Sequence, residues 1–157
     1  MNTLISPGQA LRLAFAPDEC LPPDAVTAAD IAAAEERYLV PVLGRALHSR
    51  LLNDYDRSFV DGYLAAPLAL YTRLLLQPRL DVRAGRSGTT VPKSDNASPA
   101  GAAACRSVRA ALLTEARSLL RRAVARIESY PESFPEYRPA QNVLNRCSLH
   151  GKLVQTR

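Results

Sequence analysis

The chain has 157 residues, of which 47 % are hydrophobic and 22 % are charged, and it has no tryptophan. This balance excludes disorder over most of the length, and the length is sufficient for one domain with a real core. The net charge of +5 divides unevenly, because residues 1–61 carry 5 − 9 = −4 and residues 62–157 carry 15 − 6 = +9. The basic part would suit either nucleic acid or the acidic surface of a neighbouring copy.

The N-terminal segment predicts a short helix and then an extended connection. Ser6 followed by Pro7 is typical of a helix start, in which serine caps the helix and proline takes its first position. Pro17 and the pair Pro22-Pro23 then favour an extended linker, because proline fixes its own backbone angle and restricts the residue before it.

Two long helices follow, and we expect them to be antiparallel. The first spans 27–52 and opens on Thr27 and Asp30, which are spaced as in a capping box. The second spans 57–77, and its apolar stripe is broad enough to contact more than one neighbour, so part of it is a candidate interface with another chain.

Both long helices contain an internal proline, and the first also contains a glycine. Pro41 and Gly44 lie in "ERYLVPVLGRAL", and Pro67 lies in "YLAAPLALY". A proline inside a helix removes a backbone hydrogen bond and costs about 3 kcal/mol. We predict that the two helices bend at matching heights, with Gly44 permitting a close backbone approach. The alternative is that each helix breaks in two.

Residues 78–98 change pattern and predict a protruding β-hairpin or extended arm. Apolar and polar residues alternate before Gly85 and Gly88, which supply turns, and a second short strand can follow. Four basic residues lie in or beside this segment and are its candidate contacts with a neighbouring subunit or with DNA: Arg79, Arg83, Arg86 and Lys93.

The last predicted helix spans 99–130, with Ser98 as its cap, and a tail of turns occupies 131–157. The core face of this last helix is aliphatic, and the rest of the helix surface is rich in arginine. The fold predicted for the single domain 1–157 is therefore mainly α, a bundle of three to five helices, two of them with internal prolines, plus the arm.

No pattern in the chain has the spacing that catalysis requires. A lone histidine such as His48 is expected to be exposed or partly buried, and His150 beside Cys147 lies in the tail. Glu35 and Glu36 are adjacent, so their side chains point about 100° apart on a helix and do not form an acid–base pair by themselves. We predict no enzyme activity, no cofactor, no metal site and no small-molecule substrate.

The three cysteines are far apart and lack metal-ligand spacing, which favours a reduced compartment. No stretch reaches the ~18 uninterrupted apolar residues of a membrane span, so no membrane partner is expected. The arginines of the last helix are expected to form a solvated or salt-bridged face more often than a phosphate-binding surface.

Three stretches resemble a family of small helical proteins encoded among phage and prophage structural genes, the head–tail connector or adaptor subunits. They are "ADIAAAEERYLVPVLGRAL", "YLAAPLALYTRLLLQPRLDVRAGRSG" and "RRAVARIESYPESFPEYRP" with the later "NVLNRC". The resemblance implies a subunit that assembles into a ring between portal and tail, with DNA passing through the lumen. The matching positions would be structural: Glu35, Tyr38, Pro41, Gly44, Pro67, Tyr71, Gly85 and Gly88.

From these features the expected function is that of a structural virion protein, present in the host cytoplasm during assembly. Its partners would be copies of itself, portal and tail components, and non-specifically bound DNA. The alternative is a basic helical protein that binds DNA or takes part in packaging.

Overall fold

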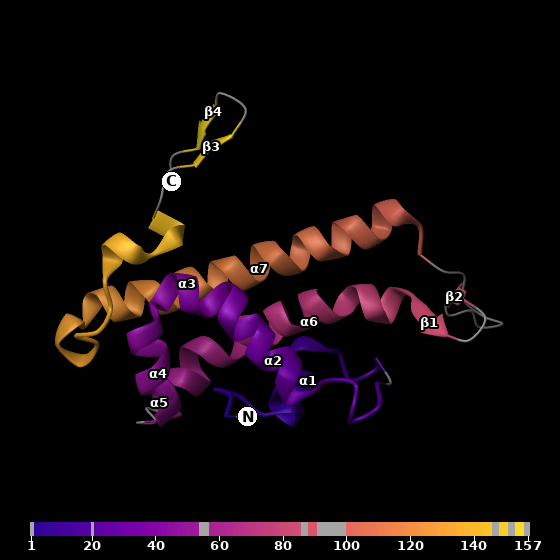
Figure 1. Cartoon of the computed structure of the whole chain (residues 1–157), viewed down its shortest axis with the longest axis horizontal. Coiled ribbons are helices and arrows are strands. Elements are labelled where there is room, and N and C mark those ends of the chain that lie inside the picture. The colour runs from indigo at the N-terminus through magenta and orange to yellow at the C-terminus, as the bar shows by residue number, and fades with distance from the viewer. Residues whose placement is uncertain are drawn as a thin grey trace.

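Helices provide most of the regular structure of the described residues in a computed structural model of the chain (Figure 1). The structure describes residues 2–19, 21–53, 57–85, 88–90, 100–145, 148–150 and 153–155. One long helical stretch, Arg57–Asp81, ends in α6 (Ala65–Asp81), and another is α7 (Ala102–Ser129). These two stretches pack together along the molecule. The shorter helices α1 (Pro7–Ala14) and α2 (Ala28–Ala34) also pack on α6. The prediction of a mainly helical bundle is confirmed.

The helix starts predicted for the N-terminal third are present. Ser6 Oγ accepts the backbone N–H of Gln9, and the Gln9 side chain accepts the backbone N–H of Ser6, which completes a capping box. Thr27 and Asp30 make the same reciprocal pair at the start of α2. Each pair satisfies two backbone N–H groups that the first helical turn leaves without partners.

Pro41 and Pro67, the internal prolines noted in the sequence, each follow a π-helical turn. The turn η1 (Glu35–Leu39) joins α2 to α3 (Val40–Leu43), and η2 (Val60–Leu64) joins α5 (Arg57–Phe59) to α6. In η1 the N–H of Val40 donates to the carbonyl of residue 35, and in η2 the N–H of Ala65 donates to that of Val60. These wider turns move the carbonyls away from the rings of Pro41 and Pro67, so both helices continue through their prolines.

The first long helix breaks at Gly44, and this corrects the prediction of one helix over 27–52. Gly44 has φ 84° and ψ 151°, and α4 (Arg45–Asn53) begins directly after it. That backbone region is accessible almost only to glycine. A Cβ at this position would meet only Gln141 Oε1, at an ordinary 3.9 Å, so backbone angle and not close approach requires the glycine.

The second long helix is longer than predicted, since α6 continues past 77 to Asp81 and includes Pro78. The predicted arm therefore cannot begin at 78. Next come two three-residue strands, β1 (Arg83–Gly85) and β2 (Gly88–Thr90), which pair antiparallel with Arg83 opposite Thr90. Residues 91–98 lie outside the described residues, and the protruding arm stays a prediction.

The last helix runs from Ala102 to Ser129 with Gly101 as its N-cap, so it starts three residues later than expected, and Ser98 lies outside the described residues. Three short 3₁₀ helices follow, η3 (Pro131–Ser133), η4 (Pro139–Gln141) and η5 (Val143–Asn145). The strands β3 (Ser148–His150) and β4 (Leu153–Gln155) pair antiparallel and stand off the helical body in Figure 1.

Part of the tail packs against the bundle. Phe134 is buried, and its ring centroid lies 4.7 Å from that of Phe59. Arg50 on α4 donates to Glu136 Oε2 at 2.6 Å and to the carbonyl of Ser133 at 2.9 Å. The tail residues nearest α7 are therefore held against α4 and α5.

Arg73 on α6 fixes the connection that follows α1. Its guanidinium donates to the carbonyl of Ala14 at 2.5 Å and to Glu19 Oε1 at 3.0 Å, and it lies 4.6 Å from the centre of the Phe15 ring. One arginine thus satisfies a helix-end carbonyl and covers an aromatic face.

In the searched part of the chain, the helical stretch Arg57–Asp81 has the length and the apolar composition that a membrane-spanning helix requires. However, 67 % of its most apolar window is buried inside the protein, and the core helix of a globular bundle meets the same criterion. Its leucines pack against α1, α2 and α7 in this structure.

Replacing Gly44 by alanine is expected to lower the free energy of unfolding by about 1–3 kcal/mol, because alanine is strained at φ 84°. Urea unfolding followed by circular dichroism measures this loss. The matched control is Gly62→Ala, since Gly62 lies in η2 with open space around a Cβ and should lose no stability. Equal losses in the two variants would contradict the backbone explanation.

Candidate functional site

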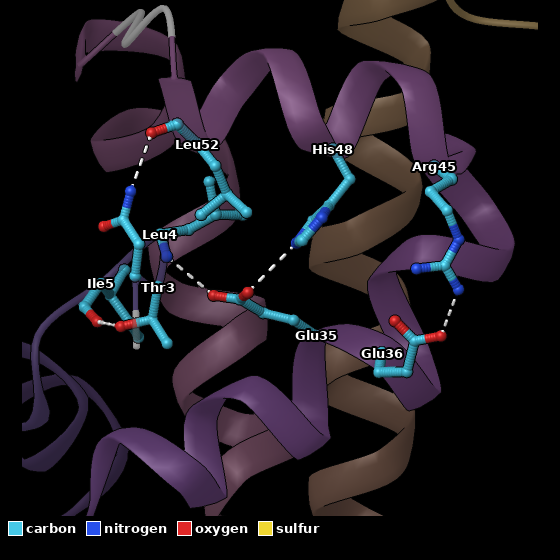
Figure 2. A network of polar contacts seen from close by, with 9 residues as sticks. Thr3, Leu4, Ile5, Glu35, Glu36, Arg45, His48 and Leu52 are labelled. Atoms are coloured by element: carbon cyan, nitrogen blue, oxygen red, sulfur yellow. Dashed lines mark hydrogen bonds and ion pairs between the residues drawn. The ribbon is translucent and has the colours of Figure 1, made fainter.

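A buried carboxylate, that of Glu35, forms the centre of a polar cluster that joins distant parts of the described chain. Glu35, at the start of η1, is 3 % exposed, and His48 on α4 is 9 % exposed. The Glu35 Oε1 atom accepts the backbone N–H of Leu4 at 2.7 Å, and its Oε2 atom lies 3.1 Å from His48 Nε2. Figure 2 shows Glu35 reaching between the N-terminal segment and α4. The expectation that His48 is exposed or partly buried is wrong.

The geometry of this pair is that of a structural clamp. Both carboxylate oxygens are engaged, and the residues that line the described surface hollows include neither Glu35 nor His48. Within the searched part of the chain, no three His, Cys, Asp or Glu side chains are grouped to hold a metal ion. The pair joins three segments that are distant in sequence: residues 2–6, η1 and α4.

The neighbouring glutamate has a different environment. The ion pair of Glu36 with Arg45 is on the right side of Figure 2. Glu36 Oε1 lies 2.5 Å from Arg45 Nη2, and both side chains are more than half exposed. Adjacent positions on one helix thus give one buried and one solvent-exposed carboxylate. The prediction that these two glutamates do not act as a pair agrees with this arrangement.

A stacked pair of tyrosines joins η1 to α6 beside the arginines of α7. The Tyr38 and Tyr71 rings are 4.3 Å apart and nearly parallel, at 8°. Burial raises the pKa of the Tyr71 phenol to about 12, although the positive charges of Arg117 and Arg121 act in the opposite direction. The charges of both arginines on α7 therefore act on the phenol of Tyr71.

The arginines of α7 are exposed and make few contacts within the described chain. Arg122 donates to the carbonyl of Gly62 at 3.1 Å, and Arg126 lies 3.8 Å from the centre of the Tyr130 ring. The remaining four form no ion pair or hydrogen bond with any residue that the structure describes: Arg106, Arg109, Arg117 and Arg121. The helix thus presents a cationic surface that its own acidic residues do not neutralise.

Of the four basic residues predicted for the arm, the structure describes two, Arg79 and Arg83, and places them on different elements. Arg79 lies on α6, and its Nη2 atom is 2.6 Å from Asp30 Oδ1 on α2. Burial alone would raise the pKa of Asp30, but hydrogen bonds from Thr27 and Arg79 hold it below its ordinary value. Arg83 is in β1, whereas Arg86 and Lys93 lie outside the described residues.

The sequence analysis missed the Glu35–His48 pair and the role of Arg73. The two members of the pair are 13 positions apart, across the break at Gly44, and no local pattern joins them. The available signal for Glu35 was its position beside Ile31 and Ala34 on the apolar face of the predicted helix.

Replacing Glu35 by alanine is expected to lower the free energy of unfolding by about 3–5 kcal/mol, because it leaves the Leu4 N–H and His48 without their buried acceptor. Denaturant unfolding at neutral pH measures the change. Glu36→Ala is the matched control and should cost less than about 1 kcal/mol, because its ion pair is exposed. A Glu35 variant as stable as the Glu36 variant would exclude the clamp.

The Tyr71 phenol makes stability depend on pH in the alkaline range. Its folded pKa of about 12 exceeds the ordinary value of 10.0, so the unfolded chain releases this proton first and stability falls between pH 10 and pH 12. The loss is expected to be about 3 kcal/mol over that range. Unfolding midpoints measured across it should fall less for Tyr71→Phe than for the unchanged chain, and identical profiles would contradict the assignment.

Comparison with known proteins places the chain in a family without assigning a role. No curated protein matches it, and no solved structure matches it. A family model described as a family of unknown function (DUF6712) matches residues 39–146, which is more than two-thirds of the chain. The match includes Gly44, His48, all of α6 and all of α7. The protein therefore belongs to the DUF6712 family.

Proposed function

We propose that the protein is a structural subunit of a phage or prophage virion, a head–tail connector or adaptor that forms a ring between portal and tail. It acts as a non-enzymatic protein without cofactor or small-molecule substrate. It is made in the host cytoplasm and becomes part of the particle. The observation that supports this best is the exposed arginine surface of α7, which lacks internal ion pairs in the described chain and is therefore available to other macromolecules.

The polar cluster around Glu35 fits a structural role better than a catalytic one. A general base or nucleophile must reach its substrate, whereas Glu35 is 3 % exposed and both of its oxygens accept contacts from the protein. The resemblance of the chain to connector subunits supports the same view, because the matching positions Glu35, Tyr38, Pro41 and Gly44 all occur in or beside η1 and α3.

The basic hairpin segment is part of the proposal. Its candidate contacts with a neighbouring copy or DNA are Arg83, Arg86 and Lys93, and Arg79 is excluded because it pairs with Asp30. The pairing of β1 with β2 supports a turn at this place. A strand pair without a larger sheet has edges that a neighbouring chain can cover.

The alternative function is that of a basic DNA-binding or packaging-associated protein. The observation that favours it is the charge of α7, which has six arginines and two glutamates, together with the tyrosine stack beside Arg117 and Arg121. Exposed arginines on one helix are suited to binding a phosphate backbone.

Deleting the gene from the phage or prophage that encodes it tests the proposed function. We expect electron microscopy to show filled heads and free tails that do not join, because a connector is needed at their junction. Peptides of this chain should also be detected in purified wild-type particles. Complete tailed particles from the deletion would overturn the proposal.

Neutralising the hairpin segment in Arg83→Ala/Arg86→Ala is expected to reduce particle assembly without changing the thermal unfolding transition of the purified protein. Loss of that transition would mean that the segment belongs to the core. A DNA mobility-shift assay over a range of salt concentrations separates the alternative. Binding that falls steeply with salt and weakens in Arg117→Ala/Arg121→Ala would favour the DNA-binding protein.

A further inference from the structure

The first ten residues of α7 form a helix segment that no described element covers. Every residue of this free segment (Ala102–Ala111) is exposed except Cys105, which is partly exposed. The buried face of α7 begins at Leu112 and continues at helical spacing through Ala116. Toward the N-terminus of α7, the same helical spacing reaches Arg109 and Cys105, and no described element covers this side of the helix there. Val108, on this segment, is 43 % exposed.

A second surface, the Leu21 groove, lies where the proline-rich linker crosses α1 and α6. Leu21 lines two adjoining hollows, of about 440 Å³ and about 460 Å³. Their walls are largely apolar, with Leu11 and Phe15 in one hollow and Leu76 and Leu80 in the other. This groove is wide enough to receive apolar side chains from another helix.

The charges of the two surfaces are opposite and are not neutralised within the described chain. Asp18 and Asp24 are exposed on the linker beside the groove and form no ion pair there, in contrast to Glu19 and Asp30, which Arg73 and Arg79 neutralise. Arg106 and Arg109 are likewise exposed and unpaired on the free segment. The basic residue on the wall of one hollow is Arg12, and Arg79 on the other is already bound to Asp30.

We propose that the free segment of α7 docks in the Leu21 groove of a second copy of this chain. Val108 would enter the apolar hollows, while Arg106 and Arg109 would approach Asp18 and Asp24. Pairing of one free segment with another would bring like charges together, so it is disfavoured. Because the two surfaces differ, each docked copy leaves one of each free, and the contact propagates into a ring or an open chain.

This inference rests on the proposed function, since it names the contact surfaces of a self-assembling subunit. The mechanism requires only these two surfaces and no change of fold. All four charged residues are exposed, so substituting them should leave the thermal unfolding transition unchanged.

A charge-swap experiment tests the contact in solution. One variant, Arg106→Glu/Arg109→Glu, makes the free segment acidic, and a second, Asp18→Arg/Asp24→Arg, makes the groove basic. Sedimentation at several concentrations should show that each variant self-associates roughly tenfold more weakly, or worse, than the unchanged chain. An equimolar mixture should recover association, because acidic segments then meet basic grooves and basic segments meet acidic grooves.

The chain with all four substitutions is the matched control and should also recover association, since its segment and groove are again opposite in charge. A second control, Arg117→Glu/Arg121→Glu, changes charge on α7 outside the free segment and should leave association unchanged. The proposal is overturned if the unchanged chain stays monomeric at all concentrations, if the swapped variants associate normally, or if the mixture does not recover.

The outcome also separates this inference from the proposed function. Particles that contain the protein, together with charge-swap variants that associate normally, would remove the docking contact and leave the connector role intact. Recovery in the mixture, together with particles that lack the protein, would remove the connector role and leave the contact. If association requires added DNA, the partner of the free segment is nucleic acid and not a second copy of the chain.

Discussion

The burial of the Glu35 carboxylate is the constraint on which the N-terminal half of the molecule depends. A carboxylate taken out of water is costly unless it is hydrogen-bonded or paired, and the Leu4 N–H and His48 supply those contacts. Leu4 and Ile5 are buried at 1 % and 2 % exposure, so the segment that Glu35 holds is part of the core. The same carboxylate also fixes α4, since His48 reaches it only because the chain changes direction at Gly44.

The elements that follow local rules could be predicted from the sequence. Ser6 and Thr27 cap helices as expected, because a side chain and backbone N–H groups three residues apart decide a helix start. The π-helical turns could not be predicted, since shifting one hydrogen bond to the fifth residue alters the apolar spacing very little. A break in each long helix was the alternative interpretation, and the structure has one in the first helix, at Gly44 with φ 84°, whereas the second helix continues through Pro67.

The contacts of the candidate site were harder to predict than the helices, because they join residues far apart in the chain. Arg79 pairs with Asp30 across 49 positions, which moves it from the predicted arm to the side of α6. His48 was expected to be exposed or partly buried, because its partner Glu35 lies 13 positions away, on the other side of the break at Gly44. The arginine-rich surface of α7 could be predicted from the sequence. That four of its arginines form no ion pair with the described residues could be learned only from the fold.

Part of the uneven charge of the chain is neutralised by ion pairs within the bundle, whereas four arginines of α7 form no ion pair with the described residues. Arg45, Arg73 and Arg79 neutralise glutamates and an aspartate of the acidic third, so those acids are not available to a neighbour. The residues at the start of α7 form no such ion pairs with the described residues, and they do not pack against any described element. An isolated helix of ten residues is marginal in water, so the free segment is maintained by the packed turns from Leu112 to Ile127 that continue it. A bundle that holds ten residues in a helical conformation without burying them presents a preformed surface, and binding to such a surface does not require further ordering of its backbone.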